Sequence, residues 1–166
     1  MKLTLTTVAL FCLELALPAG DAFGQTAKDF AGFWTIVSVD KVNQDGSKGE
    51  PAFGPNPKGF LVFDSSSHYV LQIISAGLPK FSSNNRMRGT AEENKAVAQG
   101  MVAHFGKYSV NQADLTVTFH IERSSFPNLE GTEQRLPFTI TGDQLNFSLV
   151  TRQGGGSVGA VWERAK

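Results

Sequence analysis

This sequence contains few cysteines, tyrosines or tryptophans, and neither sign of charge is in excess. Its one cysteine, Cys12, lies in an apolar segment near the start, so the rest of the chain can form no disulfide and offers no thiolate nucleophile. Lys and Arg together number 15, as do Asp and Glu, so the formal net charge is zero. Because nucleic-acid and polybasic membrane-surface binding leave a basic footprint, we expect neither partner.

Motifs for metal binding and nucleophilic catalysis are also missing. The three histidines, His68, His104 and His120, are too scattered to give the spacing of metal ligands, and no glycine-flanked nucleophilic serine is present. The glycine run at 154–156 lies between two alternating segments, so it predicts a hairpin loop and not a phosphate-binding turn. We therefore expect no metal and no cofactor.

The first 24 residues have the composition of a secretory signal peptide. Lys2 precedes a mostly apolar run at 3–17, and small residues at 22 and 24 precede a predicted cleavage before Gln25. A membrane anchor is the alternative, but the run is too short to span a bilayer comfortably and Glu14 interrupts it. The sequence predicts an exported protein, periplasmic or extracellular, whose mature domain at 25–166 has no integral membrane span.

Glycine and phenylalanine are abundant, with 17 and 13 residues, and they occur in short apolar runs separated by turn residues. Alternation of apolar and polar residues with a period of two is typical of strands with one buried face. In the segment 115–122, for example, Val117, Phe119 and Ile121 share one face. The predicted strands are residues 33–39, 58–63, 68–74, 107–110, 115–122, 133–141, 145–151 and 158–164.

These eight strands follow one another in near-sequential hairpins, which is the order of an up-and-down antiparallel barrel. Closure removes the exposed edges that an open antiparallel sheet would have to protect. The sequence therefore predicts a mainly β fold, an eight-stranded barrel with one α-helix. A β-sandwich is the alternative, since a strand pattern does not show closure.

One segment predicts a helix. Thr90, followed three residues later by Glu93, forms a capping box at the start of a helix over 90–105, which Gly106 would end. We expect this helix to pack on the sheet or close one end of it, with His104 interacting with the helix C-terminus. The apolar residues that would form its buried stripe are Val97, Met101 and Phe105.

The two tryptophans lie in the first and last predicted strands. In a closed barrel these strands are neighbours, so Trp34 and Trp162 are predicted to pack at the seam, with Arg164 stacking on an indole ring.

Several short segments, taken together, resemble the lipocalin-like domain family of bacterial and fungal proteins. They cover nearly all of the mature chain, from about 31 to 164. The resemblance implies a lipocalin-like barrel and no particular activity, because a fold does not carry a function with it. The matching segments are 31–34 (AGFW), 54–61 (GPNPKGFL), 106–108 (GKY), 120–122 (HIE), 125–128 (SFPN), 131–135 (GTEQR) and 161–164 (VWER).

Polar residues on two successive predicted strands are the candidate site. His120 and Glu122 share a strand face, and Arg135 lies at an alternate position on the next strand, beside Glu133. If the strands pair, these side chains, with Tyr108, could grip a polar ligand group or move a proton. The alternative is that this face meets water while the apolar face fills the barrel.

Three functions remain open, and we favour the first. It is a carrier that holds a small apolar or amphipathic molecule in the barrel. The second is an isomerase, cyclase or lyase whose candidate catalytic residues are His120, Glu122, Tyr108 and Arg135. The third is a packed barrel that acts through its surface. The candidate ligand-binding residues are Tyr108, Phe119, His120, Glu122, Arg135 and Phe138.

Overall fold

The computed structural model describes residues 26–43, 45–150 and 157–166. The expected signal peptide, Cys12 and the glycine run at 154–156 lie outside these residues. Within the described part of the chain, no helix is both long and apolar enough to cross a membrane.

The elements follow one another in a simple order. In the described residues they are α1 (Ala27–Phe30), β1 (Gly32–Val42), β2 (Lys48–Pro51), β3 (Lys58–Phe63), β4 (His68–Ile74), the 3-10 helix η1 (Arg86–Arg88), α2 (Ala91–Gln99), β5 (Met101–Asn111), β6 (Thr116–Ser124), the 3-10 helix η2 (Pro127–Leu129), β7 (Glu133–Thr141), β8 (Gln144–Val150) and β9 (Ser157–Arg164).

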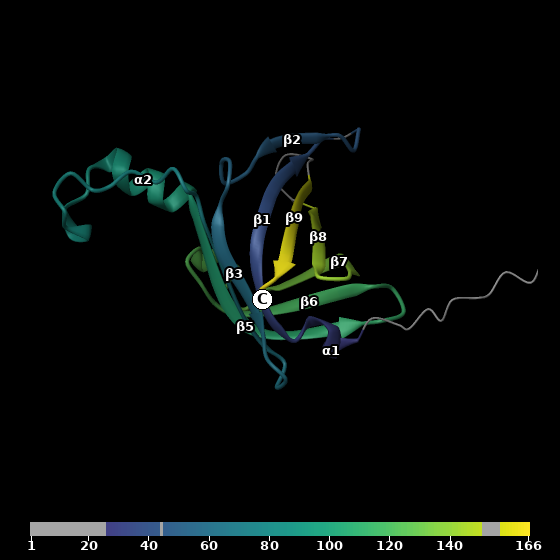
Figure 1. The fold of residues 1–166 in the computed structure, drawn as a ribbon. Coiled ribbons are helices and arrows are strands. Elements are labelled where there is room, and N and C mark those ends of the chain that lie inside the picture. Colours follow the sequence, from purple (N-terminus) through teal and green to yellow (C-terminus); the bar gives the residue numbers. More distant parts are fainter. Residues whose placement is uncertain (1–25, 44, 151–156) are drawn as a thin grey trace, which may run out of the picture.

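Eight of the strands close into a barrel (Figure 1). Each of β3 to β9 pairs antiparallel with its neighbour in sequence, and β1 pairs with both β3 and β9. The β1–β9 register runs from Trp34 opposite Arg164 to Val42 opposite Ser157, so the ring is closed along most of both strands. The predicted barrel is confirmed, and the sandwich is excluded. The short strand β2 pairs with β1 outside this ring and was not predicted.

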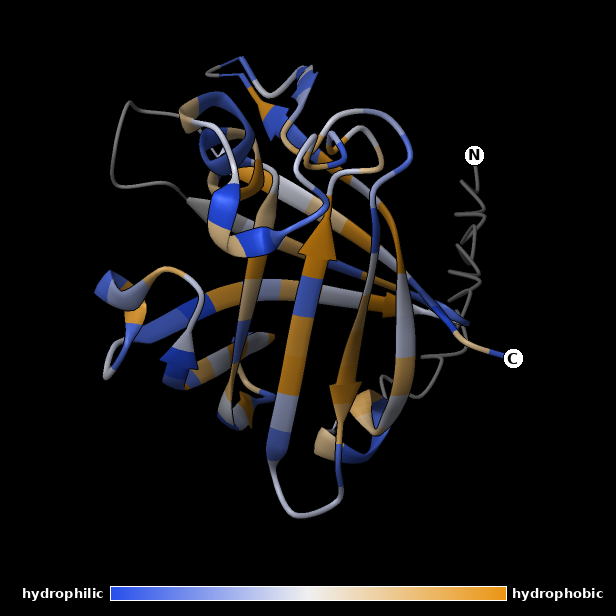
Figure 2. Ribbon diagram, turned by 90° about the vertical axis from the view of Figure 1, so that its left-hand side faces the viewer, coloured by the Kyte–Doolittle hydropathy of each residue, from blue (hydrophilic) through white to orange (hydrophobic). Residues whose placement is uncertain are grey.

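Hydrophobic and hydrophilic residues alternate along several strands in Figure 2, and burial separates an apolar interior from a polar exterior. On β6, for example, Val117, Phe119 and Ile121 are buried, whereas Thr118 and His120 between them are partly exposed. The buried apolar side chains form one continuous cluster inside the ring. The apolar face of the predicted strands is therefore the inside of the barrel.

The seam between the first and last strands is built as the sequence predicts. The Arg164 guanidinium lies 4.1 Å from the centroid of the Trp34 ring, and both tryptophans are fully buried. The indole Nε1–H of Trp34 donates to the carbonyl oxygen of Phe30, 2.8 Å away. This hydrogen bond ties the short helix α1 to the first strand.

Helix α1 covers one end of the barrel. Its Phe30 side chain is fully buried and its ring centroid lies 5.1 Å from that of Phe63 and 4.6 Å from that of Phe138, both edge-on. The rings of Tyr108 and Phe147 lie slightly farther away. An aromatic plug therefore fills this end, which the sequence pattern did not predict.

The predicted helix over 90–105 is only partly correct. The capping box is present, with the Glu93 amide donating to Thr90 Oγ1 at 3.2 Å, but α2 ends at Gln99 and Met101 begins β5. A spacing of four residues, as between Val97, Met101 and Phe105, places side chains on one face of a helix and also on one face of a strand. Residues 101–105 are therefore compatible with either structure. Pairing with β4 and β6 decides for the strand.

Helix α2 does not close the barrel. It extends away from the strands in Figure 1, and none of its residues is buried. The end opposite α1, where β4 leads into α2 and β6 into η2, is therefore not covered by α2 in the way that Phe30 covers the other end.

Candidate ligand-binding site

His120 lies on the outer wall of the barrel. Its Nδ1 lies 2.9 Å from a carboxylate oxygen of Glu133, directly opposite on β7, and its Nε2 lies 3.2 Å from Ser109 Oγ on β5. Its side chain is 41% exposed and that of Glu133 is 67% exposed. The predicted proximity of His120 and Glu133 is correct, but the pair faces water.

The order Ser109, His120, Glu133 is that of a nucleophile, a base and an orienting carboxylate. Acyl transfer also needs pre-organised donors in a site from which water is excluded. An exposed wall of a sheet does not exclude water, so this arrangement is better explained as a hydrogen-bonded network on the barrel surface.

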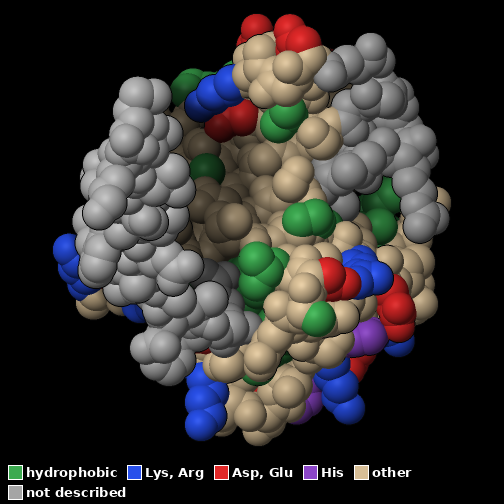
Figure 3. All heavy atoms as spheres, turned by 90° about the vertical axis from the view of Figure 1, so that its right-hand side faces the viewer, with side chains coloured by type: hydrophobic (Ala, Val, Ile, Leu, Met, Phe, Trp, Pro, Cys, Tyr) green, Lys and Arg blue, Asp and Glu red, His purple; other side chains and the backbone are tan. Residues whose placement is uncertain are grey.

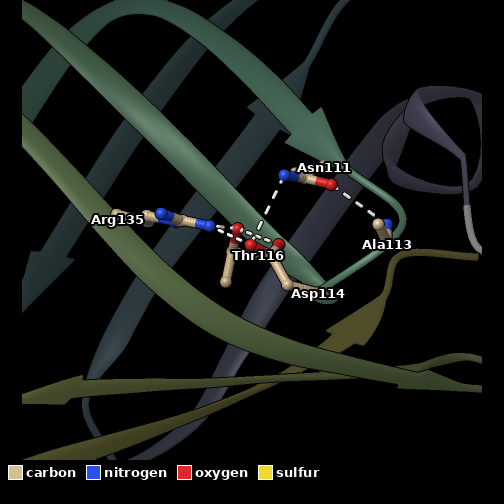
Figure 4. Close-up of polar contacts among 5 residues, drawn as sticks. All are labelled: Asn111, Ala113, Asp114, Thr116 and Arg135. Carbon is tan, nitrogen blue, oxygen red and sulfur yellow. Dashed lines mark hydrogen bonds and ion pairs between the residues drawn. The ribbon is translucent and has the colours of Figure 1, made fainter.

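Arg135 is also on the outer wall, where it joins the β5–β6 turn and not His120. Its guanidinium pairs with the Asp114 carboxylate, and its Nε donates to Thr116 Oγ1 at 3.1 Å (Figure 4). The Thr116 hydroxyl donates to Asp114 at 2.6 Å. Arg135 and Thr116 reduce the pKa of Asp114, with the Thr116 hydrogen bond as the largest cause.

The proposed quartet of His120, Glu122, Tyr108 and Arg135 therefore does not assemble. Tyr108 is buried inside, and its hydroxyl donates to the carbonyl oxygen of Asp64 at 3.1 Å, near the end that α1 covers. Glu122 is exposed. The physical reason is strand alternation: once Phe119 points inward, His120 must point outward.

The interior contains a different polar pair. The Tyr69 hydroxyl on β4 lies 2.8 Å from Nδ1 of His104 on β5, and the two side chains are 2% and 7% exposed. The sequence pattern predicts His104 at a helix terminus and does not predict this pair. The signal was present, because His104, Gly106 and Tyr108 alternate in the sequence and share the inward face of β5.

An aromatic ring packs against both members of the Tyr69–His104 pair. The ring centroid of Phe119 lies 4.5 Å from that of Tyr69 and 6.2 Å from that of His104. Phe119 also lies 5.7 Å from Phe147, which continues the aromatic lining toward β8. Phe119 and Phe138, both predicted to line the barrel, do face inward. The pair thus lies in an otherwise apolar wall.

A second polar group lies on the opposite wall. Trp162 on β9 is fully buried, and its indole Nε1–H finds no acceptor among the residues that the structure describes. In the ring of eight strands, β9 is four strands from β5 in either direction, so Trp162 and His104 are on opposite walls. Trp162 lies near the end of β9 that pairs with Trp34, whereas His104 lies toward the end of the barrel away from α1.

Surface charge is mixed. On the face drawn in Figure 3, acidic and basic side chains are interspersed around a hollow whose walls are mostly uncharged. In the described ranges, no group of three His, Cys, Asp or Glu side chains could hold a metal ion.

A family model described as a lipocalin-like domain matches residues 31–165, which is most of the chain. The chain belongs to this lipocalin-like family. No curated protein matches this lipocalin-like chain by sequence.

Solved structures share the barrel of this lipocalin-like protein at low similarity. A designed fluorescence-activating β-barrel is 14% identical with a TM-score of 0.41, covering 84% of this chain and 96% of its own. A bovine odorant-binding protein mutant is 11% identical with a TM-score of 0.38, covering 82% and 74%. A mutant of the fluorescent protein UnaG is 12% identical with a TM-score of 0.39, covering 85% and 99%. Matches at this level carry no information about ligands.

Burial sets the protonation of the interior pair in this lipocalin-like barrel. Loss of hydration lowers the pKa of His104 to about 4, so the imidazole is neutral at physiological pH. Burial also raises the pKa of Tyr69, with a smaller contribution from the Glu122 carboxylate, so the phenol keeps its proton. Both members of the pair are therefore uncharged hydrogen-bonding groups.

The neutral His104 makes a pH dependence of stability predictable. Between a pH of about 6.5 and a pH of about 4, His104 is protonated in the unfolded chain but remains neutral in the folded protein. We therefore expect the free energy of unfolding to fall by roughly 3 kcal/mol as the pH falls through this window. Urea unfolding at several pH values measures it, and H104Q should flatten the slope. An equal slope in both proteins would contradict the prediction.

Proposed function

We propose that this protein binds a small, mainly apolar molecule inside its barrel. The observation that carries the proposal is the inner wall, where aromatic and aliphatic side chains enclose a single neutral Tyr69–His104 pair. An eight-stranded barrel is about wide enough to hold one small ligand. Apolar walls with a few placed polar groups are the usual composition of such sites.

The exposure of the inward side chains indicates where the ligand would lie. At the end plugged by α1, Phe30, Trp34 and Val117 are 0% exposed. Farther from α1, Leu71 is 8% exposed and His104, directly opposite it on β5, is 7% exposed. The packing around this pair of residues is therefore less tight than at the plugged end, and we place the ligand at Leu71 and His104.

Export is part of the proposal. The apolar leader at 3–17 and the small residues before Gln25 support it. Expression with the native leader, followed by the intact mass of the protein outside the cytoplasm, tests it. A chain that begins near Gln25 is the expected result, and a full-length chain retained in the cytoplasm would overturn it.

Titration with the neutral fluorescent dye N-phenyl-1-naphthylamine tests the binding site. We expect saturable fluorescence enhancement at one dye per protein. L71W fills the interior and should weaken dye binding at least tenfold, because one indole occupies much of a small lumen. V70W is the matched control, because Val70 is the neighbouring residue on β4 and its side chain is 46% exposed on the outer wall.

Circular dichroism and thermal melts establish that both variants fold. Equal dye affinity for L71W, V70W and the parent protein would show that the dye binds elsewhere. Absence of saturable binding to the parent protein would favour a packed interior and overturn the proposal.

A further inference from the structure

We propose that the ligand is a neutral molecule carrying a hydrogen-bond acceptor oxygen, such as a ketone, aldehyde or ester, which binds to donors on the inner wall. This inference rests on the proposed function and names the chemical class of the ligand. It follows from the hydrogen bonds that the buried polar groups leave unmade.

The Tyr69–His104 pair always has one donor to spare. The phenol O–H and the one N–H of a neutral imidazole are two donors, and the single hydrogen bond between Tyr69 and His104 Nδ1 uses one of them. If Tyr69 donates, the spare donor is Nε2–H of His104. If His104 donates, the spare donor is the phenol O–H. Neither tautomer satisfies both donors, and no further partner of either side chain occurs among the described residues.

Trp162 adds a second spare donor. An indole N–H can only donate, and this one is fully enclosed without an acceptor in the described part of the chain. A buried donor without a partner costs roughly 1–3 kcal/mol, and an acceptor oxygen on a ligand would recover much of that cost. Opposite walls therefore carry spare N–H or O–H donors, with the Tyr69–His104 pair farther from α1 and Trp162 closer to it.

The charges around the interior favour a neutral ligand over an anion. His104 and Thr116 are the buried polar or charged side chains of the described residues, so no buried Lys or Arg is available to pair with a carboxylate there. Burial opposes a positive charge on His104, and the Glu122 carboxylate is close enough to raise the pKa of Tyr69. A buried anion without a counter-ion is costly.

Three probes of nearly equal shape test the inference. Acetophenone carries a neutral acceptor, α-methylstyrene replaces its carbonyl oxygen by a methylene group, and benzoate carries a negative charge. Ligand-observed NMR titrations of the full mature protein give a dissociation constant for each. We expect acetophenone to bind about tenfold more tightly than α-methylstyrene, the factor that one recovered hydrogen bond supplies, and benzoate to bind more weakly than either.

Substitutions then locate the donors. H104F and W162F replace each donor by an apolar ring, and the preference for acetophenone should be lost in the variant whose donor binds the carbonyl. Binding of α-methylstyrene should be retained in both. H120F is the matched control, because His120 is on the outer wall, and it should keep the full preference.

The outcomes separate this inference from the proposed function. Equal affinity of the parent protein for acetophenone and α-methylstyrene would overturn the acceptor while leaving an apolar binding site in place. Tightest binding of benzoate would overturn the neutral ligand. Binding of none of the three probes, together with no dye binding, would overturn the proposed function itself. The titrations of the parent protein distinguish these outcomes even if a variant fails to fold.

Discussion

Replacement of Phe30 by alanine is expected to lower the free energy of unfolding by roughly 3–5 kcal/mol, the usual cost of removing a fully buried aromatic ring. Phe30 is 0% exposed, and it contacts aromatic rings contributed by β3, β5, β7 and β8. Its loss leaves a cavity at one end of the barrel that these strands cannot easily fill, because the closed ring restrains them.

Urea unfolding followed by circular dichroism measures the effect. F126A is the control, because Phe126 lies before η2 and its side chain is 55% exposed. We expect F126A to change stability by less than about 1 kcal/mol. A loss below about 1 kcal/mol for F30A would show that α1 does not hold the barrel end closed.

Replacement of Gly106 by alanine is the second substitution with a large expected effect. A Cβ atom at this position would lie 2.1 Å from the carbonyl oxygen of His120 and 2.9 Å from the amide nitrogen of Glu122. The β5–β6 register shifts between Phe105 and Gly106, and this irregularity brings the two backbones together. Because the nearest atoms are backbone, they cannot move aside by rotating a side chain.

We expect G106A to lose roughly 3 kcal/mol or more of stability, as severe steric overlap in a packed interior does. G159A is the matched control within a strand, because its added Cβ would meet nothing closer than Val42 Cγ2 at 3.7 Å. Thermal melts of the two variants compare them directly. Equal melting temperatures would mean that the β5–β6 pair rearranges at little cost.

The role of Gly106 also explains an error of prediction. A glycine after an apolar stripe is a common helix C-terminal signal, and the stripe by itself does not distinguish it from a glycine required opposite a bulge in a strand. Only the close approach of β6 shows why a side chain is not tolerated there. The same misassignment placed His104 at a helix end and so concealed its pairing with Tyr69.

Local patterns in the sequence were enough to predict the eight strands of the barrel and their order, apart from the first half of β5, and the N-terminus of the main helix. Period-two alternation reports a strand with one buried face, and the capping box of Thr90 and Glu93 is a contact between near neighbours. Even the contact of Trp34 with Arg164 followed once closure was assumed, since the first and last strands must then meet. These features depend on residues close in sequence or on topology alone.

The tertiary structure decided the candidate site. Alternation defines the two faces of a strand, but it does not determine which side chains of other strands each face contacts. The sequence predicts Arg135 beside His120, whereas in the structure Arg135 pairs with Asp114. The spare donors of His104 and Trp162, and the plug formed by Phe30, depend on contacts between residues far apart in the chain. Such contacts form only in the folded barrel, because strand pairing and packing bring distant residues together and remove water from the polar groups between them.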